Sequence, residues 1–199
     1  MLNQKTKSTM IIALIILFAF LLATLADMGI TLVEKKLHPL KYEEYVERYA
    51  SEYNVPEYII YAVINVESEF DPEAVSYVGA MGLMQMMPDT FTWLSSAEHL
   101  GENLSVTALY DPETSIRYGV YYLRYLFRKF HDWTNVYAAY NGGEGNVAKW
   151  LADSEYSDGK GNLTHIPFKE TRKYVKKVTR QAEFYKNTYY TATDKEIVK

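Results

Sequence analysis

A carboxylic acid closes an apolar helical pattern in the first half of the chain. Ile60, Val63, Ile64 and Glu67 are spaced i, i+3, i+4 and i+7, which is the spacing of one buried helical face. Burial raises the pKa of a carboxyl, and a carboxyl that keeps its proton near neutral pH can act as a general acid. The pattern fits equally a glutamate at a helix end that meets solvent or a core hydrogen bond. Glu67 is therefore a candidate catalytic acid.

Two further acids follow Glu67 closely, and neither is placed to act with it. Glu69 would lie roughly 200° round the helix, and Asp71 lies where Pro72 should end the helix. Ordinary glycosidases need two carboxylates that flank the scissile bond. A more distant second acid, such as Glu170, stays open. A single acid fits a reaction in which the substrate supplies its own nucleophile.

The elements that must position these groups are predicted to be helices. No segment shows sustained two-residue alternation, so the domain is predicted to be all-α. Asn54 and Pro56 separate two helices, and Asp111-Pro112-Glu113 is a strong helix start. The expected helices cover residues 41–53, 56–70, a stretch from 89 onward, 111–130, 134–140, 147–151 and 168–187.

Composition excludes several classes of function. The net charge is −4, and we see no basic patch with interleaved aromatics, so nucleic acid is not an expected partner. The chain has no Cys and four scattered His without a His-Glu-x-x-His pattern, so neither a metal nor another cofactor is expected. Residues 158–162 resemble the start of a calcium loop but lack its bidentate Glu. The 19 Tyr suit a sugar-binding cleft and suit ordinary packing as well.

The N-terminal segment is predicted to take the domain out of the cytoplasm. Residues 10–26 are apolar except Thr24, and at 1.5 Å per residue they span roughly 25 Å, the low end for crossing a bilayer. Lys5 and Lys7 precede the run, so the positive-inside rule places the following domain outside. A cleaved signal peptide is the competing interpretation, since residues 24–26 form a small-x-small site.

We therefore expect four parts in this chain. They are an anchor or signal segment over residues 1–33 with membrane contact through 10–33, a linker over 34–40, a catalytic domain over 41–190 and a tail over 191–199.

Four short stretches occur in order along the chain. They are ESEFDP at 67–72, SYVGAMGLMQMMP at 76–88, AYNGG at 139–143 and IPFKETRKYV at 166–175. Together they closely resemble family 1 of the soluble-lytic-transglycosylase-like (SLT) enzymes, which degrade murein. The resemblance covers roughly residues 45–185 and implies a lysozyme-like (goose-type/SLT) helical domain behind the N-terminal segment.

The resemblance also implies a reaction and a set of site residues. Family members cleave the β-1,4 bond between N-acetylmuramic acid and N-acetylglucosamine and leave a 1,6-anhydromuramoyl end. Glu67 matches the acid that protonates the glycosidic oxygen and then accepts the proton of the C6 hydroxyl. Tyr140 matches the tyrosine that hydrogen-bonds this carboxyl. Further matches to substrate-binding positions of the cleft are Ser76, Gln85, Met87, Asn141, Glu170 and Tyr174.

Other interpretations of these residues stay open. Ser76 also suits a turn, Met87 suits packing and Tyr140 suits a core. A hydrolytic muramidase or a non-catalytic peptidoglycan-binding module would keep the same fold. The expected partner is the peptidoglycan glycan strand. One hypothesis from size and anchoring is that the domain opens the wall for a secretion or conjugation apparatus.

Overall fold

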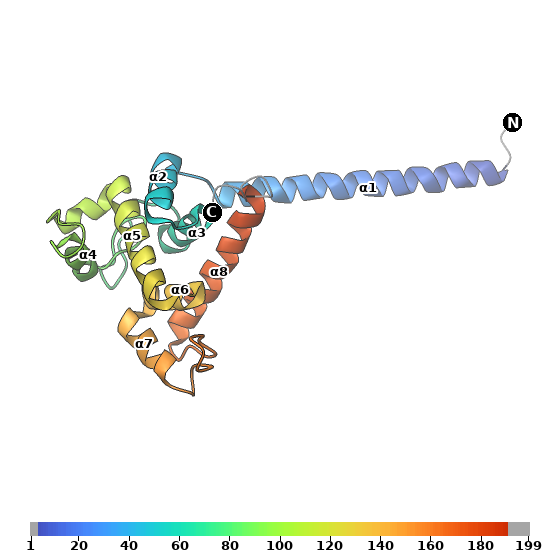
Figure 1. Cartoon of the computed structure of the whole chain (residues 1–199). Helices are drawn as coiled ribbons and strands as arrows, with labels where there is room; N and C mark the ends of the chain where they lie inside the picture. Colours follow the sequence, from blue (N-terminus) through green and yellow to red (C-terminus); the bar gives the residue numbers. More distant parts are fainter. Residues whose placement is uncertain (1–3, 191–199) are drawn as a thin grey trace. The chain divides into compact units, whose positions relative to one another are not determined.

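The computed structural model describes the backbone of residues 4–190, and side chains for residues 14–26, 28–29 and 32–190 (Figure 1). The predicted tail at 191–199 lies outside the described residues. The described helices are α1 (Gln4–Leu37), α2 (Glu43–Tyr53), α3 (Glu57–Ser68), α4 (Pro88–Ser95), the 3-10 helix η1 (Val106–Tyr110), α5 (Pro112–Phe130), α6 (Trp133–Gly142), α7 (Glu144–Ala152) and α8 (Lys169–Tyr189). Residues 4–190 contain isolated β-bridges but no strand, which confirms the all-α prediction for this part of the chain.

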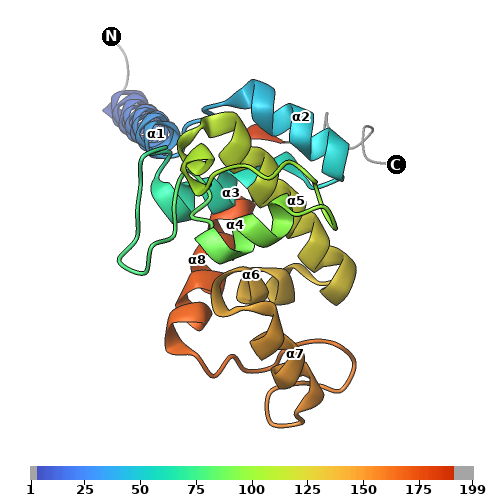
Figure 2. The same cartoon turned by 90° about the vertical axis from the view of Figure 1, so that its left-hand side faces the viewer.

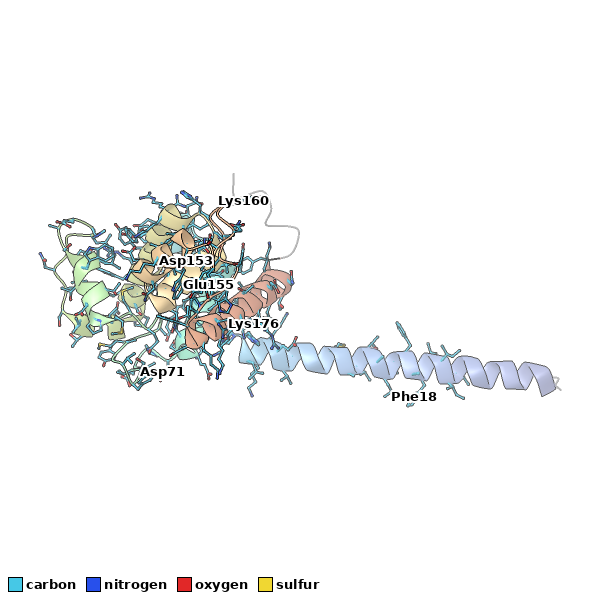
Figure 3. All side chains as sticks on the ribbon, turned by 90° about the horizontal axis from the view of Figure 1, so that it is seen from below. Phe18, Asp71, Asp153, Glu155, Lys160 and Lys176 are labelled. Atoms are coloured by element: carbon cyan, nitrogen blue, oxygen red, sulfur yellow. The ribbon has the colours of Figure 1, made fainter. Side chains whose placement is uncertain are left out.

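The chain divides into two compact units, and the division falls between Pro39 and Leu40. The first unit contains α1, whose described large apolar side chains between Leu14 and Leu37 are 51% to 68% exposed. Figure 3 shows one of them, Phe18, projecting from the helix. Within the described residues, no helix combines the length and the apolar character of a membrane span. The apolar run predicted at 10–26 begins at residues 10–13, whose side chains are outside the described set.

Helix α3 forms the centre of the second unit. Its residues from Ile59 to Asn65 are all buried, as expected for a helix that is apolar on every side. Helix α8 packs on α3 and α6, while α5 packs on α2 and α6. Figure 2 shows α7 and the loop after it at the opposite end of this unit from α2. Helices from distant parts of the sequence therefore surround the end of α3 that carries Glu67.

Helix α3 ends earlier than the sequence predicts. It stops at Ser68, and the next two residues, Glu69 and Phe70, both have left-handed backbones with φ of 51° and 66°. Consecutive non-glycine residues in this region are costly. Burial of the Phe70 ring, whose centroid lies 6.4 Å from that of Tyr61, offsets part of this cost. Glu69 therefore follows the helix and does not lie at the predicted angle round α3. Its side chain is exposed to solvent.

Helix α6 ends later than predicted and meets α8 closely. It continues through Asn141 and Gly142, and Gly143 stops it with φ of 86°. A Cβ at Gly142 would lie 2.9 Å from the Thr171 hydroxyl oxygen on α8. Glycine thus allows these two helices to approach, which brings Asn141 beside the start of α8.

Candidate active site

Glu67 lies in the last turn of α3 with its side chain half-buried. The hydroxyl of Tyr174 on α8 donates a hydrogen bond of 2.6 Å to Oε1 of Glu67. Burial raises the pKa of Glu67 from 4.5 to about 7, and the Tyr174 bond and the nearby positive charge of Lys177 partly oppose that rise. A carboxyl with this pKa can both donate and accept a proton near neutral pH.

Glu67 is the single acid of this arrangement among the described residues. Of residues 4–190, no other carboxylate contributes to its pKa shift. Glu69 is exposed beyond the helix end, and Glu170 is exposed one turn before Tyr174 on α8. The structure therefore does not bring either acid to the Glu67 carboxyl.

A buried segment at Leu83 and Met84 passes beside the end of α3. The Ser68 hydroxyl donates to the Leu83 carbonyl at 2.8 Å. The Met84 amide donates to the Ser115 hydroxyl at 3.3 Å, and the Met84 carbonyl accepts from the Tyr140 hydroxyl at 2.8 Å. Three helices, α3, α5 and α6, thus hold this segment through hydrogen bonds.

The tyrosine that donates to the carboxyl differs from the one that the family resemblance implies. Tyr140 was predicted to hydrogen-bond Glu67, but its hydroxyl donates to the backbone of Met84, and Tyr174 donates to Glu67. Burial raises the pKa of both phenols well above their ordinary range, so both remain neutral donors. Both tyrosines lie on helices that pack against the core, and helical spacing alone does not tell which one reaches the acid.

Ser76 and Gln85 make their hydrogen bonds inside the loop between α3 and α4. The Ser76 hydroxyl accepts from the Ala80 amide at 2.9 Å. The Gln85 Nε2 donates to the carbonyls of Ala74 and Gly82, at 2.9 and 3.0 Å. Because both amide protons of Gln85 are used there, its Oε1 is the group left to contact a ligand.

Met87 ends this loop immediately before α4. Its side chain is 41% exposed, whereas that of its neighbour Met86 is 2% exposed. The three methionines of this segment therefore divide between core and surface. Met84 and Met86 fill the interior, and Met87 is the one that a ligand can contact.

Asn141 and Glu170 line one cavity of about 530 Å³. The side chain of each is exposed, Asn141 from α6 and Glu170 from α8. The other lining residues are Tyr77, Val78, Gly142, Phe168, Lys169 and Thr171. Tyr77 and Phe168 were not predicted as site residues, because no periodicity in the sequence marks a loop aromatic as exposed.

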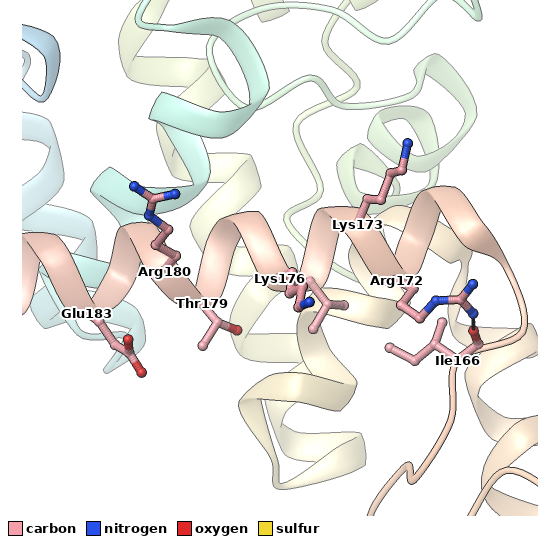
Figure 4. A pocket seen from close by; sticks show the side chains of 8 residues that line it. Ile166, Arg172, Lys173, Lys176, Thr179, Arg180 and Glu183 are labelled. Atoms are coloured by element: carbon pink, nitrogen blue, oxygen red, sulfur yellow. Dashed lines mark hydrogen bonds between the residues drawn. The ribbon is translucent and has the colours of Figure 1, made fainter.

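A second groove runs along α8 and contains none of the predicted site residues. Its volume is about 460 Å³, and its cationic lining residues are Arg172, Lys173, Lys176 and Arg180. Figure 4 shows these side chains together with the hydrogen bond that Arg172 donates to the carbonyl of Ile166. The groove is rich in cationic side chains and is separate from the site at Glu67.

The segment that resembles a calcium loop closes on itself. One oxygen of the Asp158 carboxylate accepts from the amides of Lys160 and Asn162, and the other accepts from the Asn162 side chain. Within the part of the chain that the structure describes, no group of three or more His, Cys, Asp or Glu could hold a metal. These hydrogen bonds account for Asp158 as a turn residue.

Comparison with known proteins gives consistent matches. Residues 44–162 match the family model described as the transglycosylase SLT domain. The soluble lytic murein transglycosylase of Escherichia coli strain K12 is 38% identical over 151 residues, covering 74% of this chain and 23% of that protein. The membrane-bound lytic murein transglycosylase C of Haemophilus ducreyi is 28% identical over 169 residues, covering 74% of this chain and 46% of that protein.

A solved structure shares the fold as well. It is that of an inactive glutamate-to-glutamine mutant of the lytic transglycosylase Slt from Pseudomonas aeruginosa, with a TM-score of 0.67 and 34% identity, covering 75% of this chain and 24% of that one. The chain spans less than half of the length of each of these three relatives. The match confirms the predicted lysozyme-like helical fold for the region that is compared.

Proposed function

Because the chain belongs to the transglycosylase SLT family, we propose that it is a murein lytic transglycosylase. It cleaves the β-1,4 bond between N-acetylmuramic acid and N-acetylglucosamine and leaves a 1,6-anhydromuramoyl end. The observation that supports this most directly is the half-buried carboxyl of Glu67, which has a raised pKa and a single phenolic donor.

In the proposed reaction Glu67 acts first as an acid. It gives its proton to the glycosidic oxygen while the bond from that oxygen to C1 breaks. The C6 hydroxyl oxygen of the muramoyl ring then attacks C1, and its proton passes to the Glu67 carboxylate. The acid is regenerated, and no water is consumed. Because the nucleophile belongs to the substrate, the second carboxylate of ordinary glycosidases is not needed.

The neighbouring residues have supporting roles in this proposal. Tyr174 orients the carboxyl and stabilises its charged form after the first proton transfer. Tyr140 holds the Met84 segment that lies beside the acid. Asn141 and Glu170 contact the glycan strand from the cavity that they line. Ser76 and Gln85 contact the sugar from the loop whose backbone they hold, and Met87 contributes an apolar contact.

The test is mass spectrometry of the soluble products released from purified murein. We expect products one water lighter than hydrolysed muropeptides, and we expect Glu67→Gln to slow their release by about 10²–10⁴-fold. Glu69→Gln is the matched control, since it changes an exposed glutamate two residues away and should release products at the normal rate.

Two other results would replace the proposal. Products with ordinary reducing ends would make the protein a hydrolytic muramidase. Binding of murein without any product, from the native protein and from Glu67→Gln alike, would make it a non-catalytic wall-binding module.

We also propose a location and a division of labour along the chain. Residues 10–33 hold the protein in the membrane, residues 34–40 form a linker, residues 41–190 form the catalytic domain outside the cytoplasm, and 191–199 form a tail. The apolar run at 10–26 supports this arrangement, as does the existence of a membrane-bound relative. Cleavage after Ala26 would instead release the domain.

A further inference from the structure

Two apolar side chains stand at the tip of the loop between α3 and α4. Tyr77 is 89% exposed and Val78 is 56% exposed. Leaving such side chains in water forgoes the stabilisation of burial, and clustered exposed apolar groups often mark a binding site.

The tip is held in a defined turn. The Gly79 amide donates to the Ser76 carbonyl at 3.0 Å, and the Ala80 amide donates to the Ser76 hydroxyl at 2.9 Å. The Ser76 amide donates in turn to the Ala80 carbonyl at 2.9 Å. Ser76 thus closes the turn on both sides, so Tyr77 and Val78 are presented by fixed backbone.

Phe168 contributes a second aromatic ring to the same cavity. It precedes α8, is 48% exposed, and its ring meets that of Trp150 edge-on at a centroid distance of 5.0 Å. The cavity of about 530 Å³ also exposes the amide of Asn141 and the carboxylate of Glu170. Aromatic faces next to a few hydrogen-bonding groups suit a sugar ring, which has apolar C–H faces and hydroxyls at its edge.

Two lining residues of the cavity are sequence neighbours of residues near the carboxyl that the proposed reaction uses. Glu170 lies four residues before Tyr174 on α8, a rise of about 6 Å, and Tyr174 donates to Glu67. Asn141 directly follows Tyr140, the residue that holds the Met84 segment. A glycan strand whose scissile bond is at Glu67 can therefore continue into this cavity.

We propose that Tyr77, Val78 and Phe168 form an apolar subsite with two aromatic rings, which binds a further N-acetylhexosamine ring of the glycan strand next to the turn of α8 that leads to Tyr174. The inference rests on the proposed function and adds to it. It predicts that longer strands bind more tightly, since a disaccharide cannot fill both the position at Glu67 and this subsite.

The experiment measures binding of N-acetylhexosamine oligomers by calorimetry, in full-length protein that carries Glu67→Gln so that no bond is cleaved. In this background Tyr77→Ala should weaken binding of a hexasaccharide about tenfold and leave the weaker binding of a disaccharide unchanged. Because Tyr77 is 89% exposed, its truncation removes little packing. Tyr77→Trp should restore hexasaccharide binding, and Phe168→Ala should lower it in the same way.

The matched control is Tyr110→Ala, which truncates a 37% exposed tyrosine on η1 that does not line the cavity. It should bind both sugars normally. If the hexasaccharide binds and Tyr77→Ala does not weaken it, the subsite is wrong and the proposed function stands. If neither sugar binds before Tyr77 is changed, and the native protein releases no product from murein, the proposed function and the subsite fail together.

Discussion

The acid–base behaviour of Glu67 results from opposed contributions. Burial disfavours the carboxylate, while the Tyr174 hydrogen bond and the Lys177 charge favour it, and the resulting pKa is about 7. A fully exposed carboxyl would be ionised at neutral pH and could not protonate a leaving group. A carboxyl buried without Tyr174 would hold its proton more firmly and would be a weaker acid toward the glycosidic oxygen.

The two tyrosines predict different pH profiles for their phenylalanine variants. In the proposed reaction Glu67 must start protonated, so kcat/KM should fall as pH rises through its pKa. Tyr174 donates to the charged form, so Tyr174→Phe should raise the pKa and move this alkaline limb upward by about 0.5–1 pH unit. Tyr140→Phe should leave the limb in place, because its hydroxyl donates to Met84. The measurement is kcat/KM from acidic to mildly alkaline pH.

The contrast between the variants is what tests the geometry. An upward shift in Tyr140→Phe with none in Tyr174→Phe would mean that Tyr140 is the donor to the acid, as the family resemblance implies. A loss of rate without any shift in either variant would show that neither hydroxyl tunes the carboxyl.

At the scale of elements, the loop between α3 and α4 depends on one close approach. Gly82 has φ of 75°, and a Cβ there would lie 2.0 Å from the carbonyl oxygen of Leu109. The loop can therefore pass beside η1 only with glycine at this position. That passage places Leu83 and Met84 against the end of α3, where Ser68 binds the Leu83 carbonyl.

Gly82→Ala is expected to be much more destabilising than Gly79→Ala. Both positions have a positive φ, but a Cβ at Gly79 meets nothing within 4 Å. We expect the free energy of unfolding to fall by about 1–2 kcal/mol for Gly79→Ala, and by about 3 kcal/mol or more for Gly82→Ala because the clash with backbone adds to the strain. Urea denaturation measures both. Equal losses would mean that the segment moves aside at little cost.

At the scale of the whole molecule, two units with different surfaces are joined in one chain. The second unit buries a continuous apolar core that includes α3 and the inner face of α8. The described part of α1 instead exposes its large apolar side chains. A water-exposed surface of this kind is unfavourable, which supports the proposed anchor or its removal.

Cell fractionation with intact-mass measurement tests the proposed anchor. We expect a chain that keeps residues 10–26 in the membrane fraction, extracted by detergent and not by salt, with its domain open to protease that has access to the outer side of this membrane. A variant lacking residues 10–26 should lose both properties. A shorter mature protein that begins at Asp27 would identify a signal peptide, and a domain protected from protease on the outer side of this membrane would refute export.

The sequence alone predicted the helical class, most helix positions and the candidate acid, because these depend on local patterns. The buried face of α5 follows from apolar residues repeating with the period of one helical turn, and its start follows from the cap at Asp111. The early end of α3 was not predicted, because no residue pattern nearby indicates that Glu69 and Phe70 adopt left-handed backbones. That conformation persists because the Phe70 ring is buried, which is a tertiary effect.

Only the tertiary structure decided which groups meet Glu67. Tyr174 is 107 residues from Glu67 in the sequence and 2.6 Å away in space, and Tyr140 was the expected donor until the packing of α6 and α8 was known. The same holds for the cavity shared by Tyr77, Asn141 and Phe168. Helical periodicity shows which face of a segment is buried, but hydrogen-bond partners and desolvation depend on atoms brought by other segments. The sequence therefore determined which residue carries the acid, and the packing of α3 against α8 determined its pKa.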